Sequence, residues 1–232
     1  MKFLKLSLCA AAASLTLGGA AFAQTAPTWS VNAAVTSNYV FRGVSQVGAY
    51  DPAVQGGIDL GMGMAYAGTW ASNVKFGDGT DAEVDLYAGI KPKLGAVSFD
   101  FGALYYGYID APKSDDVPYW EFKGAASVPA GPATLGAAVY YSPDYTFTPG
   151  VTAHAVYYEA NASFPVVENV SLGGAVGRQT VSKGFLDYTT WNVGVTWAFA
   201  KHLSLDTRYW DTNVDGKLYG PRVAVTLKAV LP

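Results

Sequence analysis

The chain has 232 residues, enough for one domain or one membrane barrel. Charged residues make up 14% of the chain, below the roughly one quarter expected of a soluble domain, and aromatic residues make up another 14%. A net charge of −3 without a basic stripe gives no basis for nucleic-acid binding. After residue 23 there is no apolar run of about 18 residues, which excludes a transmembrane helix there.

Residues 1–23 have the pattern of a secretory signal peptide. The segment has a positive start, an apolar run and an A-x-A cleavage pattern: Lys2 and Lys5, Leu6–Ala21, and Ala21-Phe22-Ala23. It predicts export and cleavage, with residues 24–232 as one outer-membrane β-barrel domain. The single cysteine, Cys9, would leave with the signal, so the mature chain would have no disulfide.

Apolar and polar residues alternate along most of the remaining chain, which predicts strands throughout. The first alternation starts at Trp29 and continues through Tyr39 and Phe41, which places Arg42 at the top of the first strand. The same period follows in the segments 54–60, 83–90, 97–105, 120–128, 191–199 and 222–228. Two phases compete around Thr152–Phe164, and glycines weaken the strand expected at Val170–Val181.

Short and long connections take turns between these strands. The short ones are Gly61–Gly63, Pro92–Gly95, Pro129–Pro132, Pro165–Glu168 and Ala200–His202. The long ones are Ser45–Asp51, Lys75–Asp81, Ile109–Val117, Ser142–Gly150, Ser182–Leu186 and Thr212–Gly216. This order is typical of a transmembrane barrel with tight periplasmic turns and longer extracellular loops. It predicts an all-β fold, a single antiparallel barrel of about 12 strands with both ends on the periplasmic side.

Aromatic residues cluster near the predicted strand ends, where amphipathic rings favour the membrane interfaces. The outer rim would hold Trp70, Trp120, Tyr141 and Tyr188, and the inner rim Trp29, Phe164, Trp197 and Phe199. The alternative is that these rings form the core of a soluble β-protein.

Several segments resemble the TorF family, a proteobacterial family of outer-membrane barrels labelled as porins. The opening segment Ala34–Gln46, with Thr36-Ser37-Asn38-Tyr39-Val40-Phe41-Arg42-Gly43, carries the most specific resemblance. Further similarity lies at Ala53–Asp59, Gly68–Val74, Asp85–Gly89 and Asp206–Thr212. The resemblance implies a small porin from a Gram-negative outer membrane. Such barrels usually end on an aromatic residue that the barrel-assembly machinery reads, whereas this chain ends Leu231-Pro232.

The inward-facing charges carry the functional prediction, a porin-like channel for passive diffusion of small solutes or ions. The predicted pore-lining residues are Arg42, Asp59, Glu83, Asp85, Asp100, Glu121, Lys123, Arg208 and Arg222. The same face holds Glu159, Asp206 and Lys228, and the acidic excess is slight. Alternatively, opposite charges pair and inward tyrosines fill the lumen, since 12 strands leave either outcome open. Arg42 could form a constriction or a structural salt bridge.

No catalytic, metal or cofactor site is expected. The two histidines fall at opposite ends of the barrel, His154 at the outer end of a strand and His202 in a short turn, so they cannot share a metal. The expected partners are outer-membrane lipids, small solutes or ions and the barrel-assembly machinery, and the oligomeric state stays open. A non-conducting structural or surface-interaction barrel is the main alternative, and a barrel enzyme ranks behind it.

Overall fold

A computed structural model describes residues 26–111, 118–145 and 153–232. The predicted signal peptide, and residues 112–117 and 146–152 of two predicted long loops, lie outside the described residues. The strands are β1 Thr28–Thr36, β2 Val40–Phe41, β3 Val44–Ser45, β4 Ala53–Met62, β5 Ala65–Asn73, β6 Ala82–Ile90, β7 Lys93–Leu94, β8 Val97–Ile109, β9 Tyr119–Ala130, β10 Ala133–Ser142, β11 Ala155–Val167, β12 Val170–Val181, β13 Tyr188–Ala200, β14 Leu203–Thr212 and β15 Arg222–Leu231.

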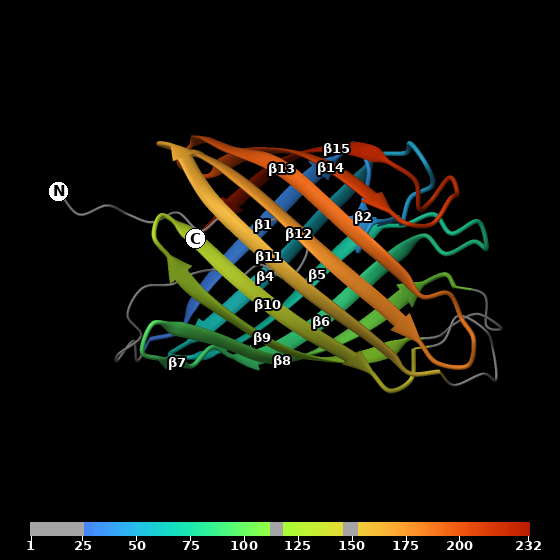
Figure 1. Cartoon of the computed structure of the whole chain (residues 1–232), viewed down its shortest axis with the longest axis horizontal. Helices are drawn as coiled ribbons and strands as arrows, with labels where there is room; N and C mark the ends of the chain where they lie inside the picture. Colours follow the sequence, from blue (N-terminus) through green and yellow to red (C-terminus); the bar gives the residue numbers. More distant parts are fainter. Residues whose placement is uncertain (1–25, 112–117, 146–152) are drawn as a thin grey trace.

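Twelve of the described strands form one closed antiparallel barrel (Figure 1). Each pairs with the next long strand along the chain, and β15 closes the ring on β1, with Leu227 opposite Val35. The strand β7 only extends the turn before β8, whereas β2 and β3 form a separate two-stranded sheet. The predicted fold class and strand number are therefore confirmed.

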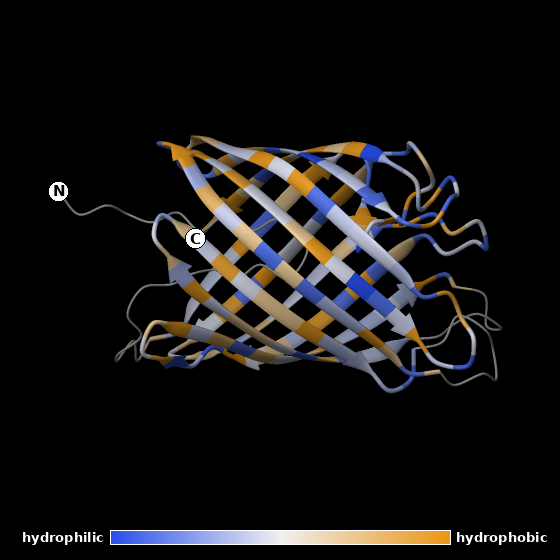
Figure 2. Ribbon diagram, viewed as in Figure 1, coloured by the Kyte–Doolittle hydropathy of each residue, from blue (hydrophilic) through white to orange (hydrophobic). Residues whose placement is uncertain are grey.

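The period of two in the sequence becomes an apolar outer face and a polar inner face. On β6, for example, Leu86 points outward and is 55% exposed, whereas its neighbour Asp85 points inward and is 8% exposed. Apolar and polar bands alternate along the strands in the same way in Figure 2. The barrel strands have nine to 13 residues, the length needed to cross a bilayer at a tilt.

The two ends of the barrel differ as the connections predict. One end carries the short turns, and there β1 begins and β15 ends, since Val31 pairs with Leu231. The opposite end carries the longer loops, which Figure 1 shows at the side away from the C-terminus. In the part of the chain that the structure describes, no helix has the length and apolarity needed to cross a membrane.

The prediction of a first strand that extends to Arg42 is wrong. The wall strand β1 ends at Thr36, whose hydroxyl donates to the Asn38 carbonyl at 3.0 Å and turns the chain. Residues 37–52 form the first long loop, loop L1, and its strands β2 and β3 make a hairpin. Alternation continues through this region because a hairpin strand repeats every two residues just as a wall strand does.

Trp70 and Tyr188 lie near the loop end of the barrel, as predicted, but they do not face the membrane interface. Trp70 lies on the inward face of β5 and packs against Tyr39 of loop L1, and Tyr188 is buried. The ambiguous phase before Phe164 resolves with Tyr157 inward and Tyr158 outward.

Candidate functional site

Loop L1 folds back into the barrel, and its hairpin is the centre of the candidate site. We call β2, β3 and the Arg42–Gly43 turn between them the lumen hairpin. Both turn residues have positive φ, 49° for Arg42 and 85° for Gly43, as a two-residue hairpin turn with a matching twist requires. A Cβ on Gly43 would lie 2.7 Å from Thr212 Cγ2 and collide with Thr190, so the tip touches the wall at β13 and β14.

Arg42 extends from the tip of the lumen hairpin to Glu121 on β9. Its two terminal nitrogens donate to the two carboxylate oxygens of Glu121 at 2.8 and 2.9 Å, which makes a bidentate ion pair. Gln179 accepts at 3.4 Å, and Tyr106 donates to Glu121 at 3.1 Å. Charge-assisted pairs with this fork geometry are the strongest hydrogen bonds in proteins. Both partners are almost fully buried, so solvent screens them little.

Aromatic rings enclose the guanidinium group. Its central carbon lies 4.7 Å from the ring centres of Phe41 and Tyr140, and 4.3 Å from that of Tyr157. A cation this close to ring faces is attracted by their quadrupoles, especially away from water. Because Tyr140 and Tyr157 belong to β10 and β11, the cage ties the hairpin tip to the wall opposite β1.

The other face of loop L1 contacts the rest of the wall. Tyr39 donates to Glu83 on β6 at 2.7 Å and packs on Trp70 with ring centres 5.3 Å apart. Val40 forms a buried cluster with Trp210 on β14 and Ala224 on β15. The hairpin region thus contacts the wall on several sides and narrows the lumen at this level.

Backbone hydrogen bonds hold loop L1 at its base. Gln46 donates to the Tyr39 carbonyl at 2.8 Å, Ser45 donates to Leu218 at 3.0 Å, and Lys75 donates to Gln46 at 2.8 Å. Loop L1 is therefore hydrogen-bonded to the loops that follow β5 and β14, in addition to its contacts with the barrel wall.

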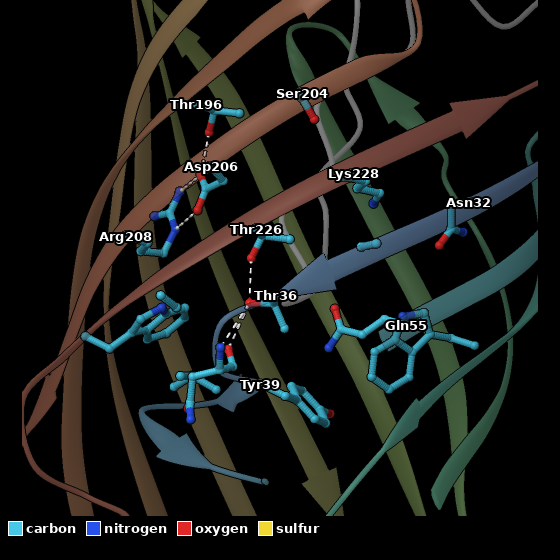
Figure 3. A pocket seen from close by; sticks show the side chains of 16 residues that line it. Asn32, Thr36, Tyr39, Gln55, Thr196, Ser204, Asp206, Arg208, Thr226 and Lys228 are labelled. Atoms are coloured by element: carbon cyan, nitrogen blue, oxygen red, sulfur yellow. Dashed lines mark hydrogen bonds and ion pairs between the residues drawn. The ribbon is translucent and has the colours of Figure 1, made fainter. Parts of the chain in front are cut away.

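Below the lumen hairpin lies a small cavity of about 70 Å³, lined by the hairpin and by strands from β13 round to β5 (Figure 3). Arg208 is held there by both oxygens of Asp206, at 3.0 and 3.2 Å, and Thr196 donates to Asp206. Figure 3 shows Lys228 and Asn32 on the same wall. The volume holds a few water molecules.

Nearer the short-turn end, a second set of inward charges is paired. Lys123 on β9 contacts Asp100 on β8 at 2.7 Å, and Tyr66 donates to the other Asp100 oxygen at 2.7 Å. Asp59 accepts from Tyr87 at 2.5 Å and from Asn32 at 3.2 Å. Neutral hydroxyl and amide groups therefore satisfy Asp59, whereas a lysine satisfies Asp100.

The nine predicted pore-lining residues thus fall into distinct groups. Arg42, Glu83, Asp85 and Glu121 lie at the level of the lumen hairpin, and Asp59, Asp100, Lys123 and Arg208 lie below it. Arg222 stands apart, because it donates to the carbonyls of Lys217 and Gly220 in the loop before β15.

Sequence reasoning missed most of the contacts around Arg42. It expected inward tyrosines but assigned no partner to any of them, and it gave Tyr157 no face and Gln179 no role. One signal was available: a two-residue Arg-Gly step flanked by Phe41 and Val44 has the layout of a tight hairpin.

The two histidines lie at opposite ends of the barrel, so they cannot share a metal ion. The described residues contain no group of three or more His, Cys, Asp or Glu side chains arranged to hold a metal. His154 is exposed just before β11, and His202 lies in the turn after β13 at the opposite end of the barrel.

The family model for Gcw_chp, described as a bacterial protein of unknown function, matches residues 20–230. The chain belongs to this family. It has no significant match among curated proteins. The TorF name stays an unconfirmed prediction.

Among solved structures, this Gcw_chp chain is similar to outer-membrane channels. The KdgM porin has a TM-score of 0.61 at 10% identity, covering 86% of this chain and 98% of its own. The NanC porin has a TM-score of 0.58 at 9% identity, covering 88% and 98%. The COG4313 outer membrane channel from Pseudomonas putida F1 has a TM-score of 0.53 at 13% identity, covering 92% and 97%. At these identities the likeness shows a porin-type barrel fold.

Proposed function

We propose that the protein is an outer-membrane channel for passive diffusion of small solutes or ions, narrowed by the lumen hairpin. The observation that carries the proposal is the polar interior of a closed barrel, crossed at one level by Arg42 and Glu121. A barrel that needed only to be filled could use apolar side chains inside, without the cost of burying charge.

The outer surface supports placement in a membrane. Large apolar residues cover it, and those most exposed include Trp29, Val54, Leu60, Leu86, Trp197 and Val223. An apolar belt of this kind around a barrel matches a lipid environment. In this proposal residues 1–23 are a cleaved export signal, the long loops face the cell exterior and the short turns face the periplasm.

The predicted pore-lining residues take two roles in this channel. The Arg42–Glu121 pair sets the narrowest level, and half-buried polar residues below it, such as Asp59 and Arg208, line a vestibule. Three bases are each committed to an acid, namely Arg42 to Glu121, Lys123 to Asp100 and Arg208 to Asp206. Asp59, Glu83 and Asp85 have no basic partner among the described residues, which favours cations over anions in the pore.

The test is single-channel recording of the purified, refolded protein in planar lipid bilayers, with a variant that lacks the lumen hairpin. Tyr39 and Gln46 already share a backbone hydrogen bond of 2.8 Å. Residues 40–45 can therefore be replaced by Gly-Gly while the base of loop L1 is kept. We expect small steps that scale with salt in the wild type and larger steps in the variant. Heat-modifiable gel migration reports that both are folded.

The second candidate is a non-conducting structural or surface-interaction barrel. The tight burial around Arg42, Glu121 and Gln179 favours it, because these side chains leave little water-accessible space. If the wild type and the hairpin-less variant are both folded and silent, this second function replaces the channel. We propose no catalytic activity in either case.

A further inference from the structure

Two carboxylates at the level of the lumen hairpin have no basic partner in the part of the chain that the structure describes. Glu83 and Asp85 are neighbours on the inward face of β6, and both are more than nine-tenths buried. Residues two apart on a strand face the same side, about 7 Å apart along it. Both side chains therefore enter the same small region beside loop L1.

The groups that surround this pair are neutral or negative. Glu83 accepts from the hydroxyl of Tyr39 at 2.7 Å, and Tyr108 on β8 is a second hydroxyl donor to it. Asp85 is flanked by Trp70 on β5 and Tyr106 on β8 in the sheet register. Its Oδ1 atom is buried and has no hydrogen-bond partner.

The cation at the level of the lumen hairpin, Arg42, is already paired. Arg42 points both of its terminal nitrogens at Glu121, which neutralises that acid. Tyr106, which lies opposite Asp85 in the sheet register, donates to Glu121, so a third acid lies beside the pair. Three acids and one base thus meet at this level of the barrel.

A carboxylate that is buried without a partner is strongly unfavourable, because the interior cannot replace its hydration. A mobile cation bound beside Glu83 and Asp85 would balance the excess negative charge at this level. We propose that Glu83 and Asp85 form a binding site for a small monovalent cation, such as Na⁺ or K⁺, and give the channel its cation preference. The second half of this inference rests on the proposed channel function, and the first half does not.

The surroundings decide the class of ligand. Carboxylate and hydroxyl oxygens are hard donors, which favour alkali and alkaline-earth ions over soft metals. Calcium needs six to eight oxygen ligands at ~2.4 Å. Only two acids meet at this site, and no cluster of three acidic, His or Cys groups fit for a metal occurs in the described residues. Tyr39 packs on Trp70 beside the pair, and this packing favours a small ion over a bulky organic cation.

Binding is tested without any current, through thermal stability. The unfolding midpoint of the refolded full chain is measured in sodium chloride and in choline chloride at equal ionic strength. A ligand that binds only the folded state raises the midpoint. We expect a higher midpoint in sodium for the wild type, and loss of this shift in both Asp85→Asn and Glu83→Gln. The control Asp51→Asn removes a charge from an exposed position of loop L1 and should keep the shift.

A wild type with equal midpoints in the two salts overturns the cation site, and so does a shift that survives in both variants. In either case the pair holds a proton instead of a metal ion.

Selectivity is tested by the reversal potential in a potassium chloride gradient. We expect a cation-selective wild type and Asp51→Asn, and a potential moved toward zero in Asp85→Asn. An unchanged potential in Asp85→Asn removes these acids from the selectivity of the channel. Silent bilayers together with a sodium-dependent midpoint would refute the channel and leave the binding site standing.

Discussion

Replacement of Arg42 by alanine tests the narrowing of the lumen most directly. The change removes the bidentate ion pair to Glu121, the contact to Gln179 and three cation–ring contacts. Glu121, which is 2% exposed in the wild type, then keeps the Tyr106 hydroxyl at 3.1 Å as its hydrogen-bond donor among the described residues. The alanine inherits the positive φ of the turn, so backbone strain stays while the contacts that offset it disappear.

The size of the effect follows from burial. Removal of one partner from a buried ion pair costs about 3–5 kcal/mol, because the other charge stays buried and unpaired. A factor of ten in an equilibrium corresponds to about 1.4 kcal/mol. The ratio of docked to undocked lumen hairpin should therefore fall on the order of a hundredfold or more. The backbone bonds from Ser45 to Leu218 and from Lys75 to Gln46 remain, so loop L1 keeps its base.

The assay is single-channel recording of wild type and Arg42→Ala, with folding confirmed by heat-modifiable migration. We expect longer or larger openings in Arg42→Ala. Arg42→Lys should be intermediate, since a lysine keeps the charge but not the fork of donors. In the double variant Arg42→Ala/Glu121→Gln, the free energy of docking the lumen hairpin should fall by less than the sum of the two single effects. The reason is that no unpaired charge is left behind. Identical conductance and open probability in folded wild type and Arg42→Ala would refute the reasoning.

Three further predictions concern the tip of the lumen hairpin, two lysine–aspartate ion pairs, and the apolar outer face of the barrel. Gly43→Ala places a methyl group against Thr190 and Thr212, so it should undock the lumen hairpin and increase openings in the same recordings. Lys123→Ala should lower the free energy of unfolding by about 3–5 kcal/mol, because Asp100 is buried with it. Lys75→Ala, which breaks an exposed pair with Asp51, should cost less than about 1 kcal/mol. Urea titration in lipid vesicles measures the free energy of unfolding of Lys123→Ala and Lys75→Ala. Equal losses of stability in the two variants would contradict the role of burial. Leu86→Arg puts a charge on the outer face of β6 and should cost about 2–4 kcal/mol in vesicles, and a neutral result would argue against a lipid-facing surface.

Much of the fold could be predicted from local pattern. On β6, the order Glu83-Val84-Asp85-Leu86 fixes which side chains face inward, because a strand alternates faces at every residue. Turn residues such as Gly63 and Gly131, both with positive φ, mark the short connections. Strand number and inward charges followed from these signals alone.

The end of β1 and the orientation of Trp70 were predicted wrongly, because the same sequence pattern occurs in two different structures. Tyr39 and Phe41 alternate in a lumen hairpin as they would in a wall strand, so periodicity could not show that β1 ends at Thr36. A tryptophan near a strand end, such as Trp70, matches the pattern of a membrane-interface aromatic. Trp70 points inward instead, where Tyr39 of loop L1 packs against its ring.

The amino-acid sequence by itself determined a closed barrel with a charged interior, since strand faces and loop lengths depend on neighbouring residues. The tertiary structure alone decided which charges meet. Arg42 and Glu121 are 79 residues apart, and Arg42 and Gln179 are 137 apart, so their contact exists only once the barrel has closed around loop L1. Among the described residues, the same closure leaves Glu83 and Asp85 without a base, because Arg42 pairs with Glu121 instead.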